Sequence, residues 1–502
     1  MKTYVHSSPL TSPRSVFPAH VGAAGPAFRA WLVLLGLLGL GGVSMIGPAA
    51  QSTNDRVATG LRQWCAADTL PAVGTPEPVA AFFARTAYVP VWTQVGGPTP
   101  AALAGLRLLA EAPRYGLPLA DYRLPQLRLL LDSVSQPNVT GQTRVRAEVQ
   151  LTTALLRFAR HLSRGRVEEP GLRPVAVGPA PAPDDLAVWL DQAVRGGELA
   201  RELLAGQPTS RSYVRLLHAW QHLLRTDSLA AARLALPVAL NLERLRWEPR
   251  PDSLSIIVNI PAFSLQVVRG PRVVATHRVI VGKAETPTPE LYSRITLFQA
   301  APEWRVPGTI AAQEMLPKLQ RDPSLLVDKG FRVYTAAGRR VNPYRVAWDR
   351  LLPEDFTYQI RQEPSAGNAL GCVVFRFANP YAIYLHDTPT KSAFRLPGRA
   401  LSHGCVRVED PLTLARFLLR HEDNPAQAGN RTQQLQASLN NAHTTAFPLH
   451  AAVPLIVRYL TCEADGGQLR QLPDVYGRDQ ALAQAWQASP APGEGAATLA
   501  LR

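Results

Sequence analysis

The sequence has 502 residues, a length that fits about two to four domains, and hydrophobic residues make up 46% of it, as is usual in globular proteins. Its four cysteines include no C-x-x-C pair, which disfavours a zinc ribbon or a thioredoxin-like motif, and four cysteines in 502 residues are too few for a disulfide scaffold. The formal net charge of +15 comes from scattered basic residues without a zinc-finger spacing or an RNA-binding signature, so a nucleic-acid-binding protein is disfavoured. Only five of the 53 basic residues are lysine, which is typical of GC-rich coding and equally of a protein attracted to an anionic polymer or membrane surface.

The N-terminal segment has the pattern of an export signal. Residues 31–46 are apolar and uncharged, and Lys2, Arg14 and Arg29 precede them without any acidic residue. Small residues at 48–50 suit cleavage by a peptidase, whereas the long basic region before the apolar run suits an uncleaved anchor. We therefore expect residues 1–50 to be a signal peptide or a membrane anchor, with possible membrane association through residues 31–46.

The next half of the chain has helical periodicity. Residues 51–80 are polar and rich in proline, which indicates a linker. Residues 81–240 show apolar positions at helical spacing and no alternation typical of strands. The helices expected most clearly cover residues 101–112, 144–164 and 212–224. This pattern predicts a helical domain.

The residue pattern changes near Asn241, where helical spacing gives way to runs typical of β-strands. A helix is expected at 411–420, and residues 488–502 form a loose tail. The sequence therefore predicts an α+β protein, with a helical domain at 81–240 and a mainly β domain at 241–487. The expected strands cover residues 255–260, 264–268, 273–281, 372–377, 382–385 and 455–460.

The segment at 402–408, S-H-G-C-V-R-V, combines the residues that a thiol nucleophile needs. The thiolate of Cys405 would be the reactive form, and the imidazole of His386, nineteen positions upstream, can take its proton and hold the two as an ion pair. Gly404 lets the backbone approach closely, so that amides near Cys405 can face a developing oxyanion. Arg407 either binds a substrate carboxylate or forms a salt bridge that supports the loop.

Other residues near this segment have weaker assignments. Tyr384 shares a face with His386 by strand alternation, so it is expected to line the site. His403 and Ser402 flank the nucleophile, and His403 fits simple packing as well as site lining. A metal site built from His386, His403 and Cys405 lacks a convincing fourth ligand, so neither metal nor cofactor is expected. Cys372 and Cys462 are interpreted as small core residues, and an oxidised pair of these two stays open, as does the role of Cys65 in or near the linker.

With S-H-G-C-V-R-V at 402–408 and H-D-T-P at 386–389, the sequence resembles the L,D-transpeptidases, the family with a YkuD-like catalytic domain. The H-D-T-P form is similar to the larger group that carries an additional helical scaffold domain. The resemblance covers about residues 240–485 well and 80–240 loosely. Further stretches similar to that group lie at 241–247, 281–283, 303–307, 367–371, 379–384 and 474–479.

The resemblance implies an enzyme of the cell envelope, on the periplasmic side, that forms 3-3 cross-links between peptidoglycan stem peptides. Cys405 would attack a donor stem tetrapeptide and His386 would act as base and then acid, with backbone amides at Gly404 and Cys405 as the oxyanion hole. Tyr384, Arg407, His403 and Ser402 would line the substrate site, and carbapenems would acylate the cysteine. Residues 321–362 would form a mobile cap whose aromatic residues contact substrate. The aromatic residues in question are Tyr334, Tyr344 and Trp348.

Two alternatives use the same residues differently. Water in place of an amine acceptor would make the protein an L,D-carboxypeptidase or a hydrolase of links between the wall and a protein. A protein of another class, an inactive wall-binding scaffold, would have lost the chemistry, against which the intact Cys405, His386 and Gly404 argue. A papain-like protease is disfavoured because its histidine follows the cysteine at a distance. The helical half also leaves no room for a separate peptidoglycan-binding module before Asn241.

Overall fold

The computed structural model describes residues 48–66, 76–169, 171–176, 185–250, 253–422 and 424–488. The apolar run at 31–46 and the tail after Ala488 lie outside these residues, so the expected signal or anchor is not described. Among the described helices, none is both long and apolar enough to span a bilayer. The elements below belong to the compact unit Thr53–Arg502, apart from the first residues of helix α1.

The first half of the chain is helical, as predicted, and its longest helix shows why. Helix α5 (Gly141–Arg164) begins where the Thr140 hydroxyl accepts a hydrogen bond from the Thr143 amide, and it ends at Gly165 with a φ of 88°. Its apolar face, including Leu155 and Phe158, is buried in the core of this half. The other helices are α1 (Pro48–Ala66), α2 (Pro76–Arg85), α3 (Pro100–Ala110), α4 (Leu124–Val134), α6 (Leu186–Arg195), α7 (Leu199–Ala205), α8 (Arg211–Thr226) and α9 (Ser228–Trp247).

Two sequence-based boundaries differ from the structure. Residues 51–80 were expected to be a linker, yet α1 and α2 occupy most of the described part of this segment, and Val57 and Leu61 are buried in the helical core. The expected change of residue pattern at Asn241 falls inside α9, which continues to Trp247, and the first strand of the β domain begins at Leu254. In both places helical spacing of apolar residues continues past the boundary that the polar and proline-rich residues around it indicated.

The second half is built around a closed sheet. Its path runs β12-β13-β15-β6-β5-β4-β16-β7, and an additional pairing of β12 with β7 joins the two ends. Leucine, isoleucine, valine and phenylalanine side chains of these strands fill a common core. The α+β fold class is thereby confirmed. The strands are β4 (Leu254–Asn259), β5 (Ser264–Arg269), β6 (Arg272–Gly282), β7 (Leu291–Ala300), β12 (Val373–Phe377), β13 (Leu385–His386), β15 (Val406–Val408) and β16 (Thr445–Arg458), with short β3 (Val175–Ala176) and β14 (Ala400–Ser402) pairing at β7 and β6.

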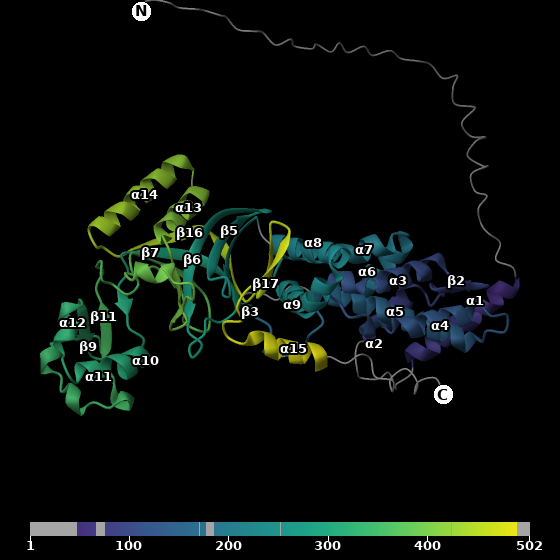
Figure 1. Ribbon diagram of the computed structural model, residues 1–502, viewed down its shortest axis with the longest axis horizontal. Coiled ribbons are helices and arrows are strands. Elements are labelled where there is room, and N and C mark those ends of the chain that lie inside the picture. The colour runs from purple at the N-terminus through teal and green to yellow at the C-terminus, as the bar shows by residue number, and fades with distance from the viewer. Residues whose placement is uncertain are drawn as a thin grey trace, which may run out of the picture. The chain divides into compact units, whose positions relative to one another are not determined.

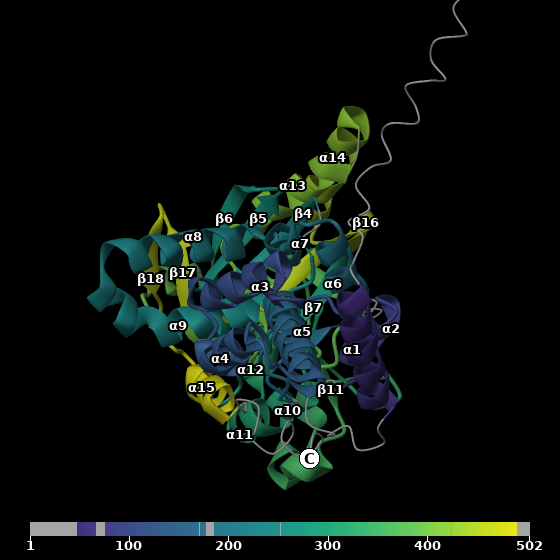
Figure 2. The same cartoon turned by 90° about the vertical axis from the view of Figure 1, so that its right-hand side faces the viewer.

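Two helices pack beside this sheet. Helix α13 (Pro411–Glu422) coincides with the expected helix and places Leu414 and Leu418 in the sheet's core. Helix α14 (Pro425–Asn440), which the sequence did not predict, follows it and buries Leu435. Figures 1 and 2, seen at right angles, both show α13 and α14 on the same side of β5 and β6.

A small unit lies between β7 and β12 in the sequence. Its four-stranded sheet has the order β10-β9-β11-β8, and Leu326, Trp348 and Ile360 belong to a core of its own. The unit includes residues upstream of the expected cap segment 321–362, because β8 and the helical turns before residue 320 complete its sheet and core. We call residues 304–362 the cap. Its elements are β8 (Trp304–Arg305), α10 (Gly308–Ile310), a π-helical turn (Ala311–Met315), α11 (Leu316–Leu319), α12 (Ser324–Asp328), β9 (Phe331–Tyr334), β10 (Arg340–Val341) and β11 (Gln359–Gln362).

The end of the described chain returns to the helical half. After β16 come the hairpin β17 (Cys462–Asp465) and β18 (Gln468–Gln471), and then helix α15 (Arg478–Ala488). Cys462, Leu482 and Trp486 are part of the helical core, and the Arg166 guanidinium lies 4.8 Å from the Trp486 ring centre. The helical half and the β domain are thus joined both through α9 and through the chain after β16.

A buried carboxylate makes the helical half sensitive to one substitution. Glu148 on α5 is fully buried and accepts hydrogen bonds from the amides of Val91, Trp92 and Thr93, at 2.7–3.2 Å, and from the Thr93 hydroxyl at 2.8 Å. We expect Glu148→Ala to lower the free energy of unfolding by about 3 kcal/mol or more, because each unsatisfied buried amide costs about 1–3 kcal/mol. Urea denaturation followed by circular dichroism measures this. Glu148→Gln, which keeps one acceptor oxygen, should lose less, and equal losses for both variants would contradict the explanation.

Candidate functional site

Two short strands bring the predicted nucleophile and base together. β13 and β15 pair in parallel, with Leu385 opposite Val406 and His386 opposite Arg407. Leu385 and Val406 are fully buried in the core of the sheet. Because side chains alternate along a strand, the neighbouring residues face the other side of the sheet. We call that side the site face; it carries Tyr384, His386, Cys405 and Arg407.

Tyr384 lies beside both reactive groups. Its ring centre lies 5.4 Å from that of His386, edge to face, and its phenol is near enough to the Cys405 thiol for each group to shift the pKa of the other. The Val406 amide donates to the Tyr384 carbonyl at 3.1 Å. The structure therefore places Tyr384, which strand alternation assigned to the face of His386, next to Cys405 as well.

The imidazole of His386 is held neutral. The residue is 6% exposed, and its Nδ1 is buried without a hydrogen-bond partner in the described chain. Burial, followed by the positive charge of Arg407, lowers the pKa of His386 to about 3, although the backbone at Asp387 and Leu370 opposes the shift. At neutral pH this side chain is an uncharged imidazole that can accept a proton.

The thiol of Cys405 is held protonated. Burial raises its pKa above the ordinary thiol value, and the neighbouring Tyr384, Arg407 and Arg376 only partly offset this. Together with the lowered pKa of His386, this direction favours a neutral thiol beside a neutral imidazole. Burial thus disfavours both charged forms of the ion pair that the sequence suggested.

The reactivity of Cys405 with an alkylating agent should show this neutral state. Iodoacetamide reacts with the thiolate, so its rate at Cys405 follows the ionised fraction. We expect the rate to rise continuously with pH through about pH 9, since the pKa of the thiol is raised above its ordinary value. Mass spectrometry of the peptide that contains Cys405 measures this rate. A plateau beginning near about pH 5 would reveal a pre-formed ion pair and contradict the expectation.

Two arginines lie on the site face near the thiol. Arg407 forms no ion pair in the described chain, and its buried Nε lacks a partner, so the structure does not contain the loop salt bridge considered from the sequence. Arg376 was missed; β12 pairs with β13 so that it lies beside Tyr384, with its guanidinium 5.0 Å from the Tyr384 ring centre. Its Nε donates to Gln299 Oε1 at 3.1 Å. An arginine inside the apolar run 372–377 was the signal that could have identified it.

The turn before the nucleophile is stabilised by hydrogen bonds of its own residue Ser402. Ser402 is buried; its hydroxyl donates to the Cys405 carbonyl at 2.5 Å and accepts from the Gly404 amide at 3.2 Å. Gly404 has a φ of 110°, a conformation that favours glycine. The hydroxyl of Ser402, which was expected near substrate, thus forms hydrogen bonds within the turn. One of them occupies the Gly404 amide. The Cys405 amide has no acceptor within the described chain.

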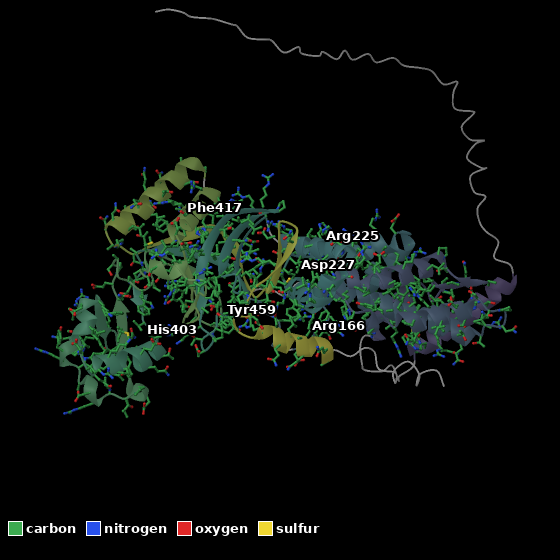
Figure 3. All side chains as sticks on the ribbon, in the orientation of Figure 1. Arg166, Arg225, Asp227, His403, Phe417 and Tyr459 are labelled. Atoms are coloured by element: carbon green, nitrogen blue, oxygen red, sulfur yellow. The ribbon has the colours of Figure 1, made fainter. Side chains whose placement is uncertain are left out.

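The side chain of His403 contacts the cap. Its Nε2 lies 2.7 Å from Oε1 of Glu314, in the π-helical turn of the cap, and its side chain is 39% exposed (Figure 3). Of the cap aromatics expected near substrate, Tyr344 is exposed, whereas Trp348 is buried in the cap's core and donates to the Pro343 carbonyl at 2.7 Å. Trp348 is therefore a packing residue. Tyr334 stacks against the guanidinium of Arg361 at 4.3 Å.

The remaining thiols are separate from this cluster. All four cysteines lie in the described part of the chain and are free. Cys372 is near Asp387, and burial raises its pKa to about 12, while Cys462 is buried in the helical core with a pKa also raised to about 12. In the described residues, no group of three His, Cys, Asp or Glu side chains is arranged to hold a metal ion.

Comparisons with known proteins match both halves. Residues 253–431 match the family of the L,D-transpeptidase catalytic domain, and residues 77–219 match the Scaffold domain. The chain thus contains an L,D-transpeptidase catalytic domain, preceded by a Scaffold domain.

Among curated proteins, a Haemophilus influenzae protein provisionally named an L,D-transpeptidase is 34% identical over 245 residues, which are 49% of this chain and 48% of that protein. The match thus spans about half the length of the relative. Two solved structures overlap only in part. They are an L,D-transpeptidase from Mycobacterium smegmatis (12% identity, 41% of this chain and 58% of that chain, TM-score 0.18) and L,D-transpeptidase 1 of Mycobacterium tuberculosis (13% identity, 41% and 62%, TM-score 0.14).

Proposed function

We propose that the protein cross-links peptidoglycan stem peptides through a thioacyl intermediate on Cys405, giving 3-3 links. The observation that carries this proposal is the cluster of Cys405, Tyr384, His386 and Arg407 on one face of an L,D-transpeptidase catalytic domain. A nucleophile, a neutral base and an unpaired cation adjoin there, which are the groups that acyl transfer to an amine requires.

The reaction proceeds in two halves. His386 takes the thiol proton as sulfur attacks the carbonyl that precedes the terminal D-Ala of a donor tetrapeptide, and the carbonyl oxygen becomes an oxyanion facing the Cys405 amide. Collapse breaks the peptide bond, and D-Ala leaves with the proton from His386. In the second half, a side-chain amine of another stem attacks the thioester, passes a proton to His386 and releases the thiol.

Arg407 is proposed to bind the donor's carboxylate. Its guanidinium lies on the site face with a buried, unpartnered Nε, and burial lowers its pKa, so a carboxylate would supply the charge partner that the described chain lacks. Arg376 and Tyr384 would line the same side of the site.

The cap, including the expected segment 321–362, is proposed to cover the acyl site. Its Glu314 already contacts His403, two residues before the nucleophile. Replacing residues 306–358 of the cap by a short linker that joins β8 to β11 should reduce transfer, and unchanged transfer would exclude this role. We further propose that residues 1–50 direct the protein to the periplasmic side of the envelope, where stem peptides are available, and that residues 241–487 act as the catalytic unit.

The test is product analysis with purified protein and a stem tetrapeptide, with and without a second stem as amine acceptor. A cross-linked dimer together with free D-Ala supports the proposal. Tripeptide in place of dimer, even with the acceptor present, would make the protein an L,D-carboxypeptidase. A folded protein that neither turns over the peptide nor gains the mass of a carbapenem would be an inactive wall-binding protein.

A further inference from the structure

A buried threonine from another part of the chain holds the peptide bond that precedes the nucleophile. Thr288 is fully buried, and its hydroxyl donates to the Gly404 carbonyl at 2.8 Å while it accepts from the Gly282 amide at 2.8 Å. We infer that Thr288 is a positioning residue, which aims the Cys405 amide at the oxyanion of the acyl-transfer step. This inference rests on the proposed function.

The geometry of a peptide unit explains how this works. The Gly404–Cys405 peptide is trans and planar, so its carbonyl and its N–H point in opposite directions. The bond from Thr288 fixes the carbonyl on one side, which fixes the Cys405 N–H on the other. That N–H has no acceptor in the described chain, whereas the Gly404 amide is taken by Ser402. The Cys405 amide is therefore the free donor of this turn.

Gly404 makes such a constraint necessary. With a φ of 110° and no side chain, its backbone has more freedom than that of any other residue type. The second side of the turn is held by Ser402, whose hydroxyl binds the Cys405 carbonyl. Thr288 restrains the peptide unit that Ser402 leaves free. Without it, the carbonyl of Gly404 could rotate and carry the N–H away from the reacting carbon.

Thr288 is itself held by a tyrosine. The Tyr476 hydroxyl accepts from the Thr288 amide at 3.2 Å and donates to the Gly282 carbonyl at 2.6 Å. A side chain at residue 282 would lie 2.2 Å from the Thr286 carbonyl oxygen, so Gly282 permits the close approach of these segments. The hydroxyl of Thr288 thus has no room to change partner.

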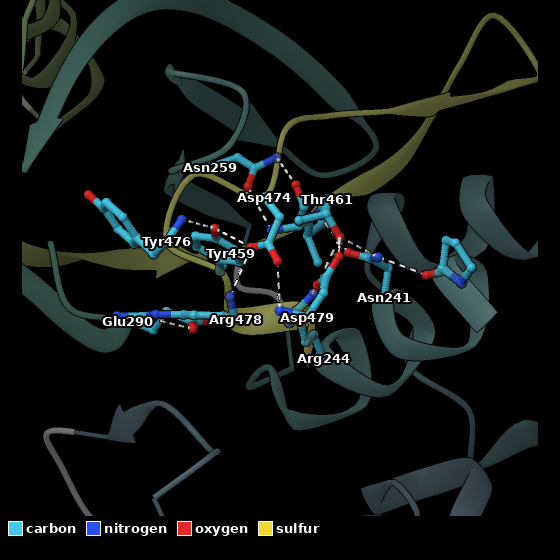
Figure 4. Close-up of polar contacts among 12 residues, drawn as sticks. Asn241, Arg244, Asn259, Glu290, Tyr459, Thr461, Asp474, Tyr476, Arg478 and Asp479 are labelled. Carbon is cyan, nitrogen blue, oxygen red and sulfur yellow. Dashed lines mark hydrogen bonds and ion pairs between the residues drawn. The ribbon is translucent and has the colours of Figure 1, made fainter. Parts of the chain in front are cut away.

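The support continues to the helical half (Figure 4). The Tyr476 amide donates to the Tyr459 hydroxyl at 2.6 Å, and Tyr459 donates to Asp474 at 2.6 Å. Asp474 also accepts from the amide of Asp479 at 3.0 Å, and Asp479 pairs with Arg244 of α9 at 2.6 Å. Each of these groups has a defined hydrogen-bond partner. The position of Thr288 is therefore fixed by this hydrogen-bonded framework rather than by a loop.

The experiment compares acylation and alkylation of Cys405 in the full chain. Acylation by a carbapenem or by a stem tetrapeptide develops an oxyanion, whereas alkylation by iodoacetamide does not. Thr288→Val should lower the maximal rate of carbapenem acylation about 10- to 100-fold with little change in the concentration for half-maximal rate, because an oxyanion donor is misdirected. Alkylation should stay at the parental rate. Thr288→Ser, which keeps the hydroxyl, should restore acylation.

A second variant covers the case in which Thr288→Val does not fold. Tyr476→Phe keeps the ring and removes the hydroxyl that holds Thr288, so it should lower acylation about 10-fold and leave alkylation unchanged. If the rates of acylation and alkylation fell equally, the positioning role would be overturned while the proposed function stands. The same would follow if Tyr476→Phe and any folded Thr288→Val were acylated at the parental rate. A parent protein that iodoacetamide alkylates, but that neither acyl donor acylates, would overturn the proposed function and this role with it.

Discussion

Cys405→Ala is expected to abolish acyl transfer, with a fall of at least about 10⁴-fold in the rate of dimer formation, since no other group on the site face can form the covalent intermediate. The neighbouring side chains there are a phenol, an imidazole and two guanidiniums, and burial raises the pKa of the Tyr384 phenol well above its ordinary value. Intact mass after incubation with a carbapenem reports the intermediate directly. The parent should gain a single adduct, and the variant none.

The control for this experiment is another cysteine. Cys65 lies on α1, half-buried against the helical core, and burial raises its pKa to about 11. Cys65→Ala should therefore keep both the adduct and the dimer. An adduct that persists in Cys405→Ala and disappears in Cys65→Ala would move the nucleophile out of the sheet and refute the assignment of the site.

His386→Gln is expected to lower the maximal rate of acylation about 10²- to 10⁴-fold, the usual contribution of a positioned general base. Glutamine approximates the size of the imidazole and can hydrogen-bond, but it cannot take the thiol proton. Because burial lowers the pKa of His386 to about 3, the parental rate should stay insensitive to its protonation from neutral pH down to about pH 4. Stopped-flow acylation by a carbapenem at several pH values measures both effects.

A second histidine serves as the matched control for this prediction. His443 is exposed in the turn after α14, away from the site face, so His443→Gln should retain the parental rate. If His386→Gln lowered acylation no more than His443→Gln, another group would be the base. A loss in His386→Gln that raising the pH reversed would indicate that the imidazole only assists ionisation of the thiol.

The motif and strand alternation were enough to predict which of the candidate residues share one face of the sheet. Spacing and residue type selected Cys405 and His386, and alternation put Tyr384 on the face of His386; all three share one face in the structure. What alternation cannot provide is the register between strands far apart in the sequence. The place of Arg376 beside Tyr384 follows from the pairing of β12 with β13, and Thr288 reaches Gly404 from a separate turn.

Some features could not be read from the sequence because packing and turn geometry use the same side chains. Trp348 was expected to face substrate, but a cap with so few apolar residues needs that ring for its own core. Ser402 looked like a binding residue because it adjoins the motif, yet its hydroxyl is used by the turn. Helix α14 was missed because its sequence is rich in glutamine and asparagine and lacks a broad apolar stripe.

The return of the chain after β16 bears on the order in which the protein folds. Leu460, Cys462, Leu482 and Trp486 belong to the same core as Val57 and Leu61 of helix α1, some 400 residues earlier in the chain. In the sequence, the sheet of the β domain is therefore inserted within the helical domain rather than attached after its end. Because this core takes residues from both sides of the sheet in the sequence, it cannot be complete until the chain as far as Trp486 is available for folding.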